Sequence, residues 1–120
     1  MAKILVIDDE ISFRTYMVAL LEDQGHELQS VDNGEDGLKL VAEQHFDLVV
    51  TDVIMPGKEG FEVCKDLLAN FPDTEVIAMS GAANDYLKIV SALGVKYTFG
   101  KPFDIKAFLA AVNDLTQPKA

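Results

Sequence analysis

The sequence predicts an α/β fold in which five parallel strands form a doubly wound sheet, in the order 2-1-3-4-5, with helices on both faces. Short β-rich runs alternate with longer stretches of helical period along the chain, which is the pattern of βαβ units. Several of the short runs are unbroken apolar stretches, as expected of parallel strands that are covered on both faces. Right-handed crossovers between five such strands allow this order, which brings the ends of the first and third strands side by side.

Strands are predicted over five short runs: 3–7, 27–31, 47–51, 75–79 and 95–99. The second run alternates more between apolar and polar residues, so we expect it at an edge of the sheet. Apolar residues at helical spacing predict helices between them, over 11–24, 35–45, 60–70, 84–93 and 104–116. Gly25, Gly94 and the Asn70 region should end helices in the left-handed conformation, and Asp104 should cap the last helix.

Length and composition limit the function. The 120 residues fit one domain, with a loose tail over 117–120. With 20 acidic residues against 10 Lys and Arg, the net charge of −10 argues against direct contact with nucleic acid. One cysteine excludes an intrachain disulfide, and no secretory signal or membrane-spanning run is visible. We therefore expect a cytoplasmic protein.

Acidic residues end two of the predicted strands. Asp8 and Asp9 follow the first run and Asp52 the third, while Lys101 follows the fifth. Because ligands bind beyond the carboxyl ends of parallel strands, these side chains should meet at one site. Three close carboxylates repel one another, and a hard cation such as Mg²⁺ relieves the conflict. We expect Asp9, Asp52 and the backbone carbonyl of Ile54 to bind the metal directly, with Asp8 acting through water.

At this point the chain resembles the receiver domain of bacterial two-component response regulators. The resemblance covers the chain from Lys3 to about Leu115. Each motif is weak alone, but the ordered set at these spacings is specific. The matching motifs are Asp8-Asp9, Asp52 with Met55-Pro56 and Gly60, Ser80-Gly81-Ala82, and Lys101-Pro102-Phe103.

The resemblance implies a single-domain, flavodoxin-like phosphoacceptor protein that does not turn over a separate substrate. Asp52 would take a phosphoryl group from a phosphohistidine of a sensor histidine kinase or a phosphotransfer protein. The Ser80 hydroxyl would turn toward that group and Lys101 would pair with it, with a cis peptide bond to Pro102. The protein would be a monomer or weak homodimer. It would contact an unknown output protein through its fourth helix, fifth strand and fifth helix, where Tyr86, Lys88, Ile89, Tyr97 and Phe99 supply apolar and aromatic material.

Two features depart from the family pattern. Thr98 stands where receivers commonly have an aromatic switch residue, and Tyr97 should point to the opposite face of its strand. We therefore expect Thr98 and Ser80, together with the helix over 84–93, to carry a subtler switch that also includes Pro102. Ile54 also offers no group that could orient an attacking water, as does Ala82, which predicts slow loss of the phosphoryl group.

Three alternatives remain open. The chain could be a degenerate receiver that acts only as an interaction module. An aspartate-nucleophile phosphatase would need a second Asp where this chain has Ile54. A flavodoxin-like electron carrier shares the topology, but the acidic loop 8–12 would repel a flavin phosphate.

Four other reactive or charged side chains are read as structural. Cys64 is expected to fill the core, His26 and His45 to face solvent, and Arg14 to form at most a surface ion pair.

Overall fold

A computed structural model describes residues 1–53, 60–81 and 85–117, without the side chains of Phe61, Asp85 and Tyr86. Its parallel sheet has the order β2-β1-β3-β4-β5, which confirms the predicted topology. The strands are β1 (Lys3–Ile7), β2 (Glu27–Val31), β3 (Leu48–Asp52), β4 (Glu75–Ser80) and β5 (Tyr97–Gly100). The helices are α1 (Ile11–Asp23), α2 (Gly34–Glu43), α3 (Gly60–Asn70), α4 (Asp85–Ala92) and α5 (Ile105–Thr116).

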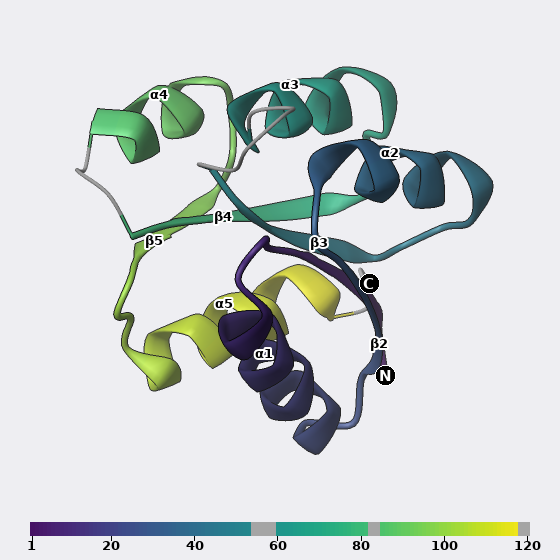
Figure 1. Cartoon of the computed structure of the whole chain (residues 1–120), viewed down its shortest axis with the longest axis vertical. Helices are drawn as coiled ribbons and strands as arrows, with labels where there is room; N and C mark the ends of the chain where they lie inside the picture. Colours follow the sequence, from purple (N-terminus) through teal and green to yellow (C-terminus); the bar gives the residue numbers. More distant parts are fainter. Residues whose placement is uncertain (54–59, 82–84, 118–120) are drawn as a thin grey trace.

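Two layers of helices enclose the sheet, with α1 and α5 on one face and α2, α3 and α4 on the other (Figure 1). The pleat of β1 illustrates how the core is divided. Ile4 and Val6 pack with α1 and α5, whereas Leu5 and Ile7 pack with the opposite layer. Because both sets of side chains are buried, this strand is apolar at successive positions. β2 has one neighbour and is only half-buried, as its alternating sequence predicted.

The fifth strand begins two residues later than predicted, at Tyr97 instead of Val95. Val95 is buried in the core beside α3 and α4 but lies outside the strand, because β4 first pairs with β5 through Ile77 and Tyr97. Gly94, with φ of 112°, turns the chain just before this segment. Burial outside the strand thus made the apolar run look longer than the strand itself.

The helix ends agree with most of the sequence signals. Gly25 and Gly94 have the predicted positive φ, at 90° and 112°. α3 ends at Asn70 as predicted, but the predicted left-handed conformation there was wrong, since no non-glycine residue among those described has a positive φ. Asp104 caps α5 as predicted, with its carboxylate accepting from the backbone N–H of Lys106 at 2.9 Å. Among the described residues, no helix has both the length and the apolar character that crossing a membrane requires.

Candidate functional site

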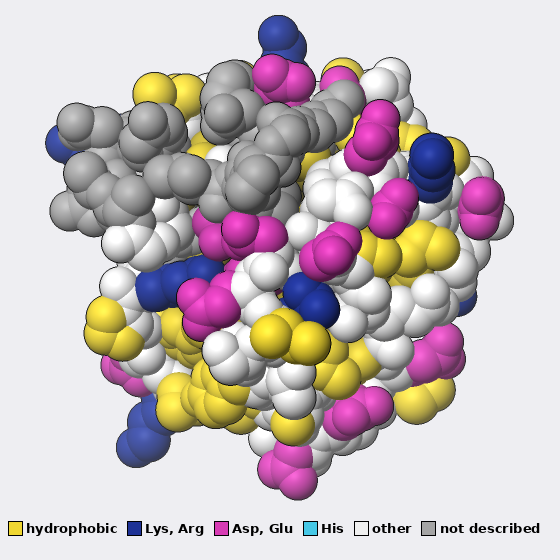
Figure 2. All heavy atoms as spheres, in the orientation of Figure 1, with side chains coloured by type: hydrophobic (Ala, Val, Ile, Leu, Met, Phe, Trp, Pro, Cys, Tyr) yellow, Lys and Arg dark blue, Asp and Glu magenta, His cyan; other side chains and the backbone are white. Residues whose placement is uncertain are grey.

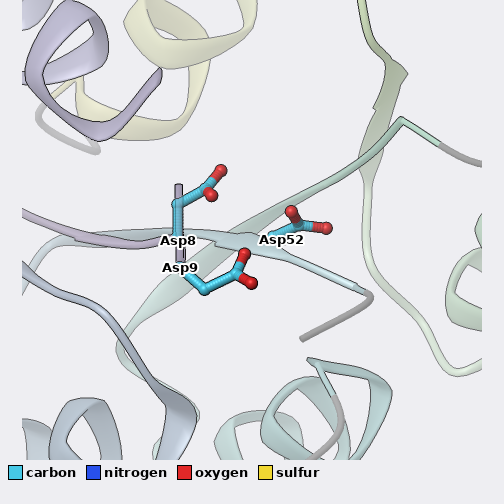
Figure 3. A group of neighbouring side chains, drawn as sticks. All are labelled: Asp8, Asp9 and Asp52. Carbon is cyan, nitrogen blue, oxygen red and sulfur yellow. The ribbon is translucent and has the colours of Figure 1, made fainter. Parts of the chain in front are cut away.

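The predicted acidic residues meet at the carboxyl ends of β1 and β3. One carboxylate oxygen from each of Asp8, Asp9 and Asp52 lies within 4.8 Å of the others. Figure 3 shows that the carboxylates of Asp9 and Asp52 turn toward the same space. Asp8 is 2% exposed and Asp52 8%, whereas Asp9 is open to solvent. The site therefore combines two buried acids with one that faces water.

Lys101 joins the two buried acids from the end of β5. Its Nζ donates to Asp8 Oδ2 at 2.8 Å and to Asp52 Oδ2 at 3.1 Å. Burial alone would lower the pKa of Lys101, but the hydrogen bonds and negative charges of Asp8 and Asp52 raise it above its usual value. The lysine is consequently charged at neutral pH and compensates part of the acidic charge.

Asp8 is held by the protein through both carboxylate oxygens. Oδ1 accepts from the backbone N–H of Glu10 at 2.9 Å, and Oδ2 accepts from Lys101. The backbone carbonyl of Asp8 accepts from Arg14 Nη1 at 2.7 Å. The prediction of a surface ion pair for Arg14 was wrong, because its partner is this carbonyl at the site. The sequence signal for this contact was a long basic side chain six residues after Asp8, early in the predicted helix.

Backbone hydrogen bonds connect the strand ends that carry the site. The N–H of Lys101 donates to the carbonyl of Ser80 at 2.8 Å, and Val53 N–H donates to Met79 at 2.8 Å. The predicted cis peptide bond joins Lys101 and Pro102. Ser80 is 1% exposed at the end of β4. Lys101 and Ser80 are therefore coupled through the backbone as well as by their common position.

Gly60 allows α3 to begin directly against the backbone of Asp52. A Cβ at this position would lie 2.0 Å from the carbonyl oxygen of Asp52 and 2.4 Å from Cα of Val53. Those atoms belong to the backbone and cannot rotate away, so only glycine fits here. This close approach explains why glycine stands at position 60, four positions beyond Pro56.

The donor set suits a hard divalent cation. Carboxylate oxygens are the ligands that Mg²⁺ prefers, and an exposed acid beside a buried one leaves room for waters in its shell. Ile54, whose carbonyl was predicted as a further ligand, and Ala82 lie outside the described residues. Figure 2 shows acidic side chains near the middle of this face of the molecule, next to basic ones.

Tyr97 and Thr98, the two β5 residues considered for the switch, lie on different faces of the sheet. Tyr97 packs against the core beside α1 and α5, and its hydroxyl donates to Asp114 Oδ2 at 2.7 Å. The neighbouring Thr98 is half-buried, and the alternation of β5 directs it to the opposite face. Thr98 pairs in register with Ala78, which packs in the core layer opposite to that of Tyr97; this agrees with the expected opposition of the two residues, and Tyr97 is held toward α5.

Of the residues that were read as structural, Cys64 and His45 have the expected positions. Burial places Cys64 in the core and raises the pKa of its thiol to about 12, and His45 is exposed. His26 was wrongly predicted to face solvent freely. It is half-buried, and its Nδ1 accepts from the N–H of Ala2 at 3.1 Å.

The acidic cluster and Lys101 lie where the strand order of the doubly wound sheet reverses. This arrangement is that of small α/β proteins that bind an anionic group beside a cation. The chain belongs to the response regulator receiver domain family, whose model matches residues 4–113. Receiver domains of this family are parts of two-component signalling systems.

Individual relatives support the assignment. Transcriptional regulatory protein AfsQ1 of Streptomyces coelicolor is 41% identical over 93 residues, which are 78% of this chain and 40% of AfsQ1. The response regulator TrrA of Thermotoga maritima, solved in complex with Mg(2+)-BeF, has a TM-score of 0.87 and 29% identity, covering 96% of this chain and 99% of TrrA. The Francisella response regulator 1452 receiver domain has a TM-score of 0.87 and 28% identity, covering 96% of both chains.

This chain spans only part of its curated relatives. It covers 40% of AfsQ1 and 26% of the DNA-binding transcriptional regulator NtrC of Azospirillum brasilense. Activities of those whole proteins are therefore not assigned to it.

Proposed function

We propose that this chain is a phosphoacceptor receiver in which Asp52 takes a phosphoryl group from a phosphohistidine of a sensor kinase or phosphotransfer protein. The observation that carries the proposal is the ammonium of Lys101, which bridges Asp8 and Asp52 within hydrogen-bonding distance. An ordinary structural ion pair would need one acid, whereas this lysine holds two buried acids beside a third.

The transfer itself makes few demands on the protein. A carboxylate oxygen of Asp52 attacks phosphorus, the P–N bond breaks, and the imidazole keeps the bonding electrons and takes up a proton. Catalysis of such steps is mainly positioning and stabilisation of charge on the equatorial oxygens. Lys101 is in place to provide that stabilisation, because its Nζ lies 3.1 Å from an oxygen of Asp52.

A magnesium ion would be held by Asp9 and Asp52, with the Ile54 carbonyl as a third protein ligand. When bound, it would supply charge compensation and in-line orientation for the phosphoryl oxygens. Asp8 would act through water, which fits its carboxylate oxygens already accepting from Glu10 and Lys101. The binding of Mg(2+)-BeF by TrrA supports the same chemistry here.

Phosphorylation would change the hydrogen bonds around Asp52. The phosphoryl group brings more charge and more acceptor oxygens than the carboxylate, so it can draw in Lys101 and the Ser80 hydroxyl. Movement of Ser80 would then reach Lys101 and Pro102 through the backbone bond at 2.8 Å. Thr98 would follow in β5, in place of the aromatic readout common in the family.

The output surface is proposed over α4, β5 and α5. Ile89 of α4 and Leu93 just after it are 54% and 39% exposed, so they leave apolar surface there for a partner to cover. Tyr86 lies outside the described side chains, and Phe99 packs among aromatic rings and so contributes less than predicted. A cytoplasmic location and a monomeric or weakly dimeric state belong to this proposal, as does a role as a signalling protein without a separate substrate.

The test is intact-mass measurement after incubation with acetyl phosphate and Mg²⁺. Wild type should gain one phosphoryl group that hydroxylamine removes, as expected of an acyl phosphate. Asp52→Asn should gain none, whereas Asp23→Asn, an exposed acid at the end of α1, should behave as wild type. Equal labelling of wild type and Asp52→Asn would move the acceptor elsewhere.

Failure of wild type to take up any phosphoryl group would instead favour the degenerate receiver. The enzyme alternative needs a different substrate, because an aspartate-nucleophile phosphatase would hydrolyse phosphomonoesters; absence of such turnover would dispose of it. A colourless purified protein would dispose of the electron carrier.

A further inference from the structure

The ammonium of Lys101 has a third neighbour besides its two acids. Nζ lies 4.0 Å from the centroid of the Phe13 ring, over its face. An ammonium carries three N–H donors, and two of them go to Asp8 and Asp52. The ring face is thus a third contact of the ammonium, beside the two carboxylates. The contact links α1 to the end of β5.

Other aromatic side chains hold the Phe13 ring in place. Phe103 meets it edge to face, with ring centroids 6.1 Å apart. Phe103 in turn lies 4.9 Å from Phe108 of α5, which is fully buried. The Phe13 ring is therefore connected to the buried core through Phe103 and Phe108. The edge-to-face pair of Phe13 and Phe103 is among the favoured aromatic geometries.

We propose that Phe13 is a positioning residue for Lys101, holding the ammonium beside Asp52 before the phosphoryl group arrives. This inference rests on the proposed phosphoacceptor function. A lysine side chain is long and loses much rotamer freedom when it is ordered. The ring face attracts a cation most strongly where water is scarce, and here the Lys101 side chain is 17% exposed.

The choice of partner also matters for the chemistry. A carboxylate in place of the ring would be a third anionic acceptor and would compete with phosphoryl oxygens for the ammonium. A benzene ring attracts the charge without offering a strong acceptor. Phe13 can thus orient Lys101 without adding a further anionic acceptor that would compete with the arriving phosphoryl oxygens for its N–H groups.

A first experiment tests the contact without phosphorylation. In protein labelled with ¹³C-lysine, ring current should shift the Hε resonances of Lys101 upfield of those of the other lysines. Lys101→Arg identifies the signal. Phe13→Leu should return it to the ordinary position, whereas Tyr16→Leu, which removes an exposed ring one turn away, should leave it unchanged. An unshifted signal in wild type would overturn the proposal.

A second experiment tests the consequence, using the rate of phosphorylation by acetyl phosphate at saturating Mg²⁺. Phe13→Leu keeps an apolar side chain but loses the ring face, so the rate should fall about fivefold, while Phe13→Tyr should stay within about twofold of wild type. Tyr16→Leu is the matched control. A Phe13→Leu rate equal to wild type, or Phe13→Tyr as slow as Phe13→Leu, would refute positioning by the ring.

The two experiments separate this inference from the proposed function. If wild type accepts no phosphoryl group, the phosphoacceptor assignment fails, and the Hε shift alone decides whether the ring holds Lys101. If wild type is phosphorylated but Lys101 shows no ring-current shift, the function stands and the role of Phe13 is rejected. Should Phe13→Leu fail to fold, the wild-type shift and the Phe13→Tyr rate still give a decision.

Discussion

Replacing Lys101 by methionine removes the charge that separates two buried carboxylates while keeping most of the side-chain volume. Without the ammonium, Asp8 and Asp52 face one another with oxygens no more than 4.8 Å apart. Their repulsion at that distance is about 3.5 kcal/mol for an effective dielectric constant of about 20. Loss of one partner from a buried ion pair typically costs about 3 to 5 kcal/mol. The two estimates agree on a loss of about 3 kcal/mol in the free energy of unfolding.

The pH for this measurement follows from the raised pKa of Lys101. A raised folded-state pKa contributes stability that is complete below the usual lysine value of 10.5 and is lost as pH rises through the folded value. At pH 7 the wild-type contribution is therefore fully present. Urea unfolding at low salt and without divalent cations should show the difference at its largest.

Magnesium should reverse part of the loss. In the Lys101→Met variant the cation would become the main compensation for the acids, so its addition should stabilise the variant more than wild type. Lys106→Met is the matched control, because it removes the same charge from an exposed position on α5. Equal stability of Lys101→Met and Lys106→Met, with equal responses to Mg²⁺, would refute the reasoning.

Three further perturbations test other parts of the structure. Gly60→Ala should lower the free energy of unfolding by about 3 kcal/mol in urea titrations, because its Cβ would lie 2.0 Å from a backbone oxygen. A Cβ at Gly81 would meet its nearest neighbour at 3.8 Å, so Gly81→Ala should be tolerated. Equal effects of the two substitutions would contradict the steric argument. The pKa of His26 is lowered from 6.5, chiefly by burial and then by the positive N-terminus. Wild type should therefore lose stability as pH falls below that value, and His26→Gln should lose less, with His45→Gln as the control. Parallel curves of the free energy of unfolding against pH for wild type and His26→Gln would reject this. Ile54→Asn should shorten the lifetime of the phosphorylated protein after removal of the donor, because an amide can orient water; unchanged decay would count against the predicted slow hydrolysis.

Local sequence determined the order of elements and the chemistry that gathers at one edge of the sheet. Unbroken apolar runs indicated strands buried on both faces, and acids directly after those runs indicated where Asp8 and Asp52 would meet. Both signals depend on the apolar character of a strand and on its end point, which neighbouring residues specify. The start of β5 was placed too early because burial of Val95 in the core does not require pairing.

Tertiary structure alone decided the partners of the long side chains. The contact of Phe13 with the Lys101 ammonium joins segments whose separation along the chain contains no signal of proximity. The hydrogen bond from Ala2 to His26 likewise joins residues that are distant in the sequence. Flexible side chains take the partner that packing brings within reach, and packing is a property of the whole fold. Residue types therefore predicted the acidic site, but the contacts that orient its lysine depend on the packing of α1 and α5 against the sheet.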